Sequence, residues 1–345
     1  LARDGIATGD GYLIAGARSG EQGTDPRGVV VRTGPDGGER SRTRLFPDQQ
    51  SEILSVVPDG DGYVGAAAVR SSSGDGPTVR AVLFRADADD QVEWREAFTA
   101  PTDGDPLGQN QLVDLAPDGD GYVATGYAAS NSFETVDGWV LSVDGSGQRR
   151  ATRRLSPRPV TLFTAVTTTT DGVVVAGQGS ESVGSQTAVG VVGELGDGLD
   201  GNWSKQVSVG PINNVRDVIA TDDGGVALAG ITQYQSQNAT PRSEAWLVKL
   251  GGEDAPRVTA TAPGTDDSST ATPSPTPTQS PSPAPTVTPS PTPTATATPV
   301  PTDDATPAGT DPGETTASGG PGFGVGAALA ALGGTALYQR ARDED

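Results

Sequence analysis

The sequence predicts an all-β fold, a propeller of four-stranded blades, over residues 1–258. Two observations predict it: one unit recurs five times along these residues, and each unit consists of short apolar segments punctuated by Asp and Gly. Repeats of four short strands are the sequence signature of propeller blades. Apolar–polar alternation would also suit a sandwich or a β-solenoid, but the regular four-strand period favours the propeller.

The first repeated element is a tight turn followed by an apolar run that ends in Ala or Gly. The glycine before each run marks the repeats, which are therefore 51, 59, 51 and 53 residues apart; these glycines are Gly11, Gly62, Gly121, Gly172 and Gly225. An Asp-Gly turn suits a hairpin because Gly adopts positive φ without steric cost. We expect this turn to join the first two strands of each blade.

The second repeated element is a mostly apolar segment of five residues with a polar side chain at its fourth position. Its fourth position is polar in every copy and lies between apolar neighbours, as in Trp246–Leu250. A strand explains the pattern, because alternate side chains point to opposite faces. For the second repeat we expect four strands, at residues 53–57, 63–69, 79–85 and 92–98.

The fifth repeat resembles a family of secreted prokaryotic propeller repeats. That family has Asp-Gly-Gly, an apolar strand ending in Ala-Gly, and Trp-Leu-Val-Lys-Leu, and this chain has Asp223–Gly225, Ala229-Gly230 and Trp246–Leu250 in the same order. The resemblance implies a fold and hardly a function. Five blades are visible. A ring of five is one interpretation, and six to eight blades in a longer protein is the other, because we expect an N-terminal segment to be missing before Leu1.

Composition excludes several classes of function. The net charge of −21 leaves no basic patch to bind phosphate, so nucleic acid is not an expected partner. The abundance of Asp and Glu and the scarcity of Lys resemble the composition of halophilic archaeal proteins. The chain has no Cys, which excludes disulfides and thiol nucleophiles. It has no His, which excludes the usual Ser-His triad.

No catalytic residue, metal site or cofactor is predicted, and the sequence is interpreted as that of a protein without enzymatic activity. Acidic residues are so abundant that no carboxylate pair stands out as an acid and base. The Asp-rich turns Asp59–Gly62 and Asp118–Gly121 lack the number of oxygen ligands that Ca²⁺ needs and are interpreted as hairpin turns. Trp139 and Trp246 share one strand position, which favours packing between blades.

Residues 259–320 are interpreted as a disordered stalk rich in Thr, Pro and Ser. Alternating Pro and Thr favours extended polyproline II, and so many hydroxyls beside Pro are typical of O-glycosylated stalks. Asn202 and Asn238 begin Asn-X-Ser/Thr sequons and are candidate N-glycosylation sites. These features predict an extracellular protein.

Residues 321–345 have the order of a sorting signal. The order is Pro321-Gly322-Phe323, an apolar run at 324–338, and then Arg340 and Arg342. It resembles the archaeal PGF-CTERM signal, which implies recognition by an archaeosortase, removal of the hydrophobic helix and attachment of a membrane lipid. A retained membrane helix is the alternative, although the run is short for a span.

The sequence therefore predicts a surface-anchored glycoprotein whose propeller binds or displays an unknown extracellular ligand. An extracellular propeller enzyme with carboxylate or cofactor chemistry is the alternative, favoured if acidic side chains converge at the channel mouth. A purely structural protein of the cell envelope, as in an S-layer, is the third interpretation, favoured if the loops form no pocket.

Overall fold

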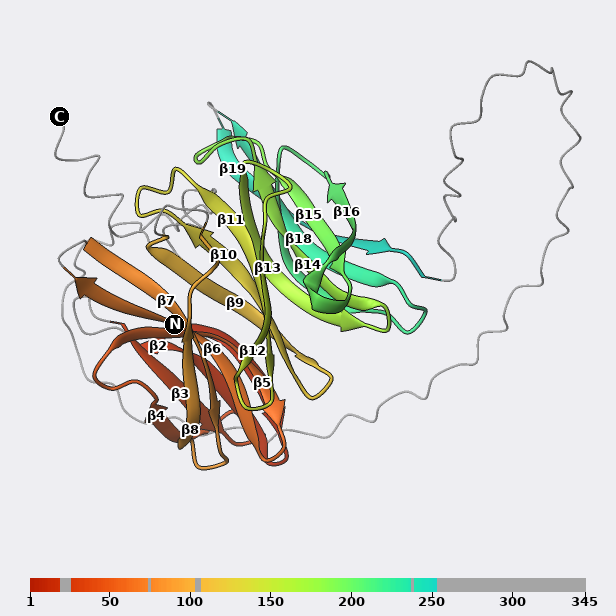
Figure 1. The fold of residues 1–345 in the computed structure, drawn as a ribbon. Coiled ribbons are helices and arrows are strands. Elements are labelled where there is room, and N and C mark those ends of the chain that lie inside the picture. The colour runs from red at the N-terminus through yellow and green to blue at the C-terminus, as the bar shows by residue number, and fades with distance from the viewer. Residues whose placement is uncertain (19–25, 74–75, 103–106, 237–238, 253–345) are drawn as a thin grey trace, which may run out of the picture. The chain divides into compact units, whose positions relative to one another are not determined.

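The chain forms a β-propeller of consecutive antiparallel blades, as the computed structural model shows for residues 1–18, 26–73, 76–102, 107–236 and 239–252 (Figure 1). The predicted fold class is confirmed. Blades 1 and 2 contain eight strands: β1 (Ala2–Thr8), β2 (Gly11–Arg18), β3 (Arg27–Thr33), β4 (Glu39–Arg44), β5 (Gln50–Asp59), β6 (Gly62–Ser73), β7 (Gly76–Ala86) and β8 (Val92–Phe98).

The same order of strands continues through the next three blades. These blades contain β9 (Gln109–Asp118), β10 (Gly121–Ala129), β11 (Val136–Asp144), β12 (Arg149–Leu155), β13 (Val160–Thr169), β14 (Gly172–Ser180), β15 (Val189–Leu195), β16 (Gly201–Val207), β17 (Ile212–Ala220), β18 (Val226–Ser236) and β19 (Ala239–Leu250). A short 3₁₀ helix, Asp197–Leu199, precedes β16. Blade 5 has three strands within the described residues, whereas the sequence predicts four.

The hairpin between the first two strands of a blade has the predicted turn chemistry. In blade 2, Asp59 pairs with Gly62 across the turn, and Gly60 adopts a φ of 58°. In blade 3, Gly119 at the equivalent position has a φ of 62°. A β-branched residue would be strained there. The interpretation of these turns as hairpins rather than Ca²⁺ loops agrees with this geometry.

The strands of the second repeat match their predicted positions closely. The predicted segment 92–98 is β8, residue for residue, and the other three strands are longer than expected. The extra residues, such as Gln50 and Ser73, are polar and continue the hydrogen-bonded ladder beyond the apolar run. Hydrophobic pattern therefore locates a strand, while backbone pairing sets where it ends.

The core lies between consecutive blades. Val64 and Leu83 of blade 2 pack in one cluster with Leu112, Trp139 and Leu141 of blade 3, and all five are completely buried. Trp139 also donates a hydrogen bond from Nε1 to Thr152 Oγ1 at 2.8 Å. The prediction that Trp139 packs between blades is confirmed. Trp246 packs at the edge of the equivalent cluster between blades 4 and 5.

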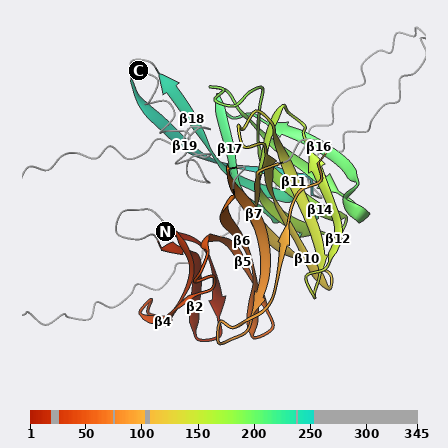
Figure 2. The same cartoon turned by 60° about the vertical axis from the view of Figure 1, so that its left-hand side comes forward.

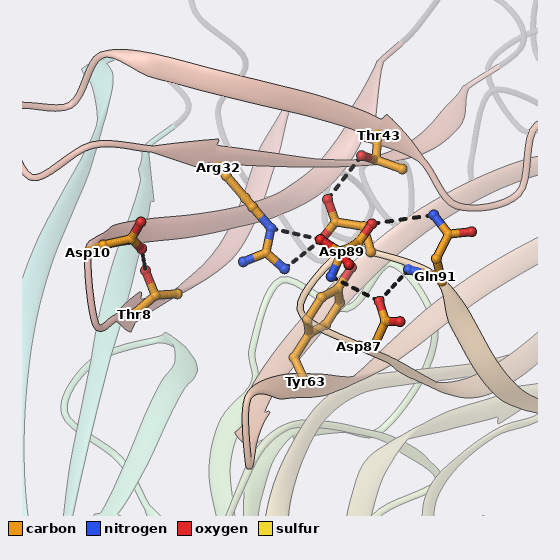
Figure 3. A network of polar contacts seen from close by, with 9 residues as sticks. Thr8, Asp10, Arg32, Thr43, Tyr63, Asp87, Asp89 and Gln91 are labelled. Carbon is orange, nitrogen blue, oxygen red and sulfur yellow. Dashed lines mark hydrogen bonds and ion pairs between the residues drawn. The ribbon is translucent and has the colours of Figure 1, made fainter.

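A buried carboxylate joins blade 1 to blade 2 (Figure 3). Asp90, 5% exposed, accepts two hydrogen bonds from Arg32 at 3.0 and 2.7 Å. Thr43 donates to the other oxygen at 2.9 Å, and the Tyr63 hydroxyl donates at 3.3 Å. Burial and the Asp90 charge raise the pKa of Tyr63, so its hydroxyl stays protonated and can donate. The pairing compensates the desolvation of this charge.

Two of the predicted regions lie outside the described residues. They are the stalk at 259–320 and the sorting signal at 321–345, with its hydrophobic run. Within the described part of the chain, no helix is long and apolar enough to cross a membrane.

We predict that Trp139→Ala lowers the free energy of unfolding by about 3–5 kcal/mol, because it leaves a cavity between two blades. Denaturant titration followed by circular dichroism would measure the change. Val183→Ala, at a site 38% exposed, is the control and should change stability by less than about 0.5 kcal/mol. Equal effects of the two substitutions would contradict the packing role of Trp139.

Candidate functional site

The innermost strands of all five blades are irregular at the same point. In each, the ladder to the second strand shifts by one residue, which leaves a bulge, as between Ala2 and Asp4 or between Val215 and Asp217. A bulge bends its strand and redirects side chains. The bulged residues are Arg3, Leu54, Val113, Thr164 and Arg216.

These bulges line one cavity of about 340 Å³, to which every blade contributes. Its walls are the five bulged residues together with Asp4, Ser55, Asp114 and Asp217. Apart from Leu54 and Val113, all of them are polar or charged. The cavity is therefore the central channel of the propeller, and three carboxylates converge in it.

One serine hydroxyl connects two of these carboxylates. Ser55 Oγ lies 3.0 Å from Asp4 Oδ2 and 3.1 Å from Asp114 Oδ1. A hydroxyl has one proton, so it can donate to only one of the two oxygens at a time. Its proton is therefore shared between the two carboxyl groups.

Asp114 keeps its proton to a higher pH than an ordinary aspartate does. Burial, reinforced by the negative charge of Asp4, raises the pKa of Asp114 to about 6. Asp4 accepts the backbone N–H groups of Gly5 and Val56 at 2.7 and 2.8 Å, and Asp114 likewise accepts those of Leu115 and Val166 at 2.9 and 2.8 Å. Ser55 thus donates to both carboxyls and shares its hydroxyl proton between Asp4 and Asp114.

The same carboxylates connect neighbouring blades. Asp4 of blade 1 accepts the N–H of Val56 in blade 2, and Asp114 of blade 3 accepts the N–H of Val166 in blade 4, both at 2.8 Å. Blade 4 has Ala165 at the equivalent position, and there Thr164 donates to the carbonyl of Val215 at 2.8 Å instead. These contacts fix the positions of the channel side chains.

Asp217 and Arg216 are the more accessible charges of the cavity. Asp217 accepts one hydrogen bond, from the N–H of Val218 at 2.8 Å, to Oδ1, and its Oδ2 accepts none in the described part of the chain. Burial against the channel lowers the pKa of Arg216, although part of its side chain reaches solvent. No carboxylate of the described residues pairs with Arg216, whereas Arg3 pairs with Glu52. An anionic group bound in the cavity would therefore be stabilised by Arg216.

Sequence reasoning missed these channel residues, although the repeats contain the signal. Asp4, Ser55, Asp114, Ala165 and Asp217 occupy one position of the aligned inner strands. An acid at this position in three repeats is unusual for an inner strand. Among the described residues no group of three or more acids is arranged to hold a metal ion.

The residues that the sequence did predict lie elsewhere. Asn202 lies in β16, where its side chain is outside the described part, and Asn238 is outside the described residues altogether. Pro321, Gly322 and Phe323 are likewise outside them. None of these five residues belongs to the channel, so glycosylation and sorting remain predictions.

Comparison with known proteins identifies no family. No family model and no curated protein matches the chain. Among solved structures, the chain is similar to a GH32 β-fructofuranosidase from Bombyx mori, with 11% identity and a TM-score of 0.40. That match covers 67% of this chain and 55% of the silkworm chain, so this chain spans about half of that protein's length.

Two further similar structures have comparable statistics. One is a GH43 endo-arabinanase from Bacillus licheniformis, at 12% identity and a TM-score of 0.35, covering 72% of this chain and 92% of the other. The second is a β-1,2-mannobiose phosphorylase from Listeria innocua, at 11% identity and a TM-score of 0.35, covering 66% and 84%. Likenesses of this degree identify no substrate.

The prediction of a protein without enzymatic activity is not upheld, because the solved structures similar to this chain are enzymes. At TM-scores of 0.35 to 0.40 they assign no activity to this chain. That prediction also rested on the observation that no carboxylate pair stands out in the sequence. In the folded chain, however, three carboxylates lie on one cavity. Asp4, Asp114 and Asp217 are far apart in sequence and lie on one cavity, because each belongs to the innermost strand of a different blade.

We predict that Asp114→Asn removes a pH-dependent component of stability. A carboxyl whose pKa rises from 3.8 to about 6 on folding stabilises the native state by about 3 kcal/mol below pH 4. This stabilisation is lost as the pH rises through 6, because the buried group then ionises. Denaturant titrations from pH 4 to 7 would show a decline in the parent protein that the variant lacks.

The control for this experiment is Asp217→Asn, which changes an exposed carboxylate of the same cavity. It should keep the parent protein's pH dependence of unfolding free energy. If Asp114→Asn shows the same decline with pH as the parent protein, then Asp114 is not the protonated carboxyl.

Proposed function

We propose that the protein is an extracellular propeller enzyme that hydrolyses a small glycoside by carboxylate acid–base chemistry in its channel. The observation that supports this most is that one cavity holds both Asp114, whose pKa is raised to about 6 by burial, and the accessible carboxylate of Asp217. Two carboxyl groups of opposite protonation are the requirement for acid–base hydrolysis.

The type of reaction follows from the residues available. Without His or Cys in the chain, neither a Ser-His pair nor a thiolate can serve as the nucleophile. Cleavage of a glycosidic bond needs only one acid, one base and water. Asp114 donates its proton to the leaving oxygen, while Asp217 takes a proton from the water that attacks the sugar carbon. The two carboxyls then exchange that proton through solvent, which restores the starting state.

The charges of the cavity indicate the class of substrate. Carboxylates accept hydrogen bonds from sugar hydroxyls, and Arg216 is placed to bind an anionic substituent. We therefore infer that the substrate contains an acidic sugar, such as a uronic acid. The cavity of about 340 Å³ suits one sugar unit at a time.

We predict that the protein hydrolyses aryl glycosides of uronic acids, measured by release of the chromophore. Asp114→Asn and Asp217→Asn should each lower kcat/KM by roughly 10²–10⁴-fold. In the parent protein kcat/KM should fall as the pH rises above about 6, because Asp114 then loses the proton that it must donate.

Two controls separate this function from a merely structural role. Asp61→Asn alters an exposed hairpin turn and should keep full activity. Arg216→Ala should raise KM for the uronic acid substrate much more than for the matching neutral glycoside. The proposal is wrong if the folded parent protein hydrolyses neither substrate, or if Asp217→Asn is fully active.

We also propose that the propeller is held at the cell surface by the tail of the chain. The support is the order of Pro321–Phe323, the apolar run and Arg340 behind a Thr/Pro-rich segment. In this proposal an archaeosortase removes the residues after the tripeptide and a membrane lipid replaces them, while Asn202 and Asn238 carry glycans.

We predict that intact-mass analysis of protein from the native membrane finds a C-terminus near Pro321 with added lipid mass. Deletion of the archaeosortase should leave the tail complete to Asp345. An unprocessed tail in both strains would contradict lipid anchoring and favour a retained membrane helix.

A further inference from the structure

The third strand of blade 4 lacks a core side chain that the two preceding blades have. The third residue of the repeated five-residue segment is Phe84 in blade 2 and Leu141 in blade 3, and each is completely buried at the junction with the preceding blade. Blade 4 has Gly193 at this position. Its neighbours on the same face, Val191 and Leu195, belong to the cluster between blades 3 and 4. This junction is therefore short of one apolar side chain.

A cavity of about 580 Å³ lies at this place, between the outer parts of blades 3 and 4. Its walls come from the end of β12 and from strands β13 to β16, and Figure 2 shows β12, β14 and β16 in the same part of the propeller. Among the described atoms, a Cβ added at Gly193 would meet only the Trp203 carbonyl oxygen at 3.4 Å and Ser204 Cβ at 3.8 Å. Both belong to blade 4, so blade 3 does not fill the space above Gly193.

The inner wall of the cavity is apolar. Phe163 and Val175 form it from blade 4, and Leu155 forms it from blade 3. Packed sheets lie about 10 Å apart, so the space left by one missing side chain between two blades is a slot. A slot with apolar walls suits a flat ring, and the volume is within the range of small-molecule sites.

Gln206 provides a hydrogen-bond donor at the opening of this slot. It pairs with Val191 in the register of β15 and β16, which places the two side chains on the same face of the sheet, toward the cavity. Arg158 donates to Gln206 Oε1 at 2.6 Å. The NH₂ group of the same amide is therefore the part of Gln206 that can donate to a bound molecule.

The charge around the opening favours an anion. Within the described residues no acidic side chain lines this cavity, whereas three line the channel. Lys205 borders the opening, and its ammonium lies 5.9 Å from the centre of the Trp203 ring without a carboxylate partner in the described part of the chain. Because Lys205 precedes Gln206 on a strand, its side chain starts from the opposite face, and it attracts an anion through space rather than by a fixed contact.

We propose that this cavity binds a small aromatic carboxylate. The ring lies in the slot against Phe163 and Val175, and the carboxylate accepts the NH₂ group of Gln206 at the opening, near Lys205. Burial of the ring supplies most of the affinity, and the polar contacts fix its orientation. No residue lines both this cavity and the channel, so the site is separate from the proposed hydrolysis.

Isothermal titration calorimetry of the full chain with 2-naphthoate tests the proposal. We expect saturable binding at one site per chain. Gly193→Leu inserts the side chain that blade 3 has at the equivalent position and should weaken binding by about tenfold or more, because it occupies the slot. The backbone at Gly193 is not in the left-handed region, so Leu is compatible with it. The matched control is Gly9→Leu, where an added Cβ meets nothing within 4 Å, and it should leave the Kd unchanged.

Two exposed side chains test how the carboxylate is bound. Gln206→Ala should weaken binding of 2-naphthoate by roughly three- to tenfold, because it removes one charge-assisted hydrogen bond. Lys205→Ala should weaken binding of 2-naphthoate by about threefold and leave binding of the neutral 2-naphthamide unchanged, because an exposed charge contributes modestly.

Four outcomes would overturn the proposal. The first is a folded parent protein that does not bind 2-naphthoate, which would make the cavity a packing defect only. The second is equal affinity in the parent protein and Gly193→Leu. If Gly193→Leu does not fold, unchanged affinity in both Gln206→Ala and Lys205→Ala has the same meaning. The fourth is equal affinity of the parent protein for 2-naphthamide and 2-naphthoate, which would exclude recognition of a carboxylate. Asp217→Asn should bind 2-naphthoate as the parent protein does, so failure of the proposed hydrolysis would not affect this test.

Discussion

The structure depends on the burial of one blade face against the next. A single four-stranded blade has two apolar faces and cannot hide both, so its stability comes from its neighbours, as in other repeat folds. The completely buried side chains, Trp139 and Leu83 among them, lie at these junctions. Stacking in this way turns the innermost strand of every blade toward one channel. The site is therefore a consequence of the packing that stabilises the fold.

The channel combines structural and chemical roles in the same side chains. Bulges on the inner strands direct Asp4 and Asp114 so that each contacts the next blade through a backbone N–H. The same placement brings the two carboxyls to a shared hydroxyl, where burial, reinforced by the charge of Asp4, raises the pKa of Asp114 to about 6. The packing that fixes Asp114 between blades thereby also shifts its pKa toward the range useful for proton transfer. The rigidity of the inner strands holds that geometry in advance of any ligand.

Acidity is general in this chain, but the channel is not simply part of an acidic surface. The net charge is −21, and the acids of hairpin turns such as Asp61 and Asp120 are exposed, so water and salt screen them. In the channel the acids are close to Arg3 and Arg216, and the cost of removing Arg216 from water is not offset by a protein carboxylate in the described part. The composition of the chain therefore does not reveal how the charges of the channel are arranged.

The sequence by itself determined the fold class, the hairpin turns and the strand positions, because these follow from local periodicity and glycine chemistry. The segment 92–98 and the turn at Gly60 are examples. It also located the packing of Trp139. The tertiary structure alone decided the site, since Asp4, Asp114 and Asp217 are brought together only when five inner strands converge. It alone showed that a cavity lies at Gly193, because an open space depends on the neighbours that pack against a residue and not on the residue itself.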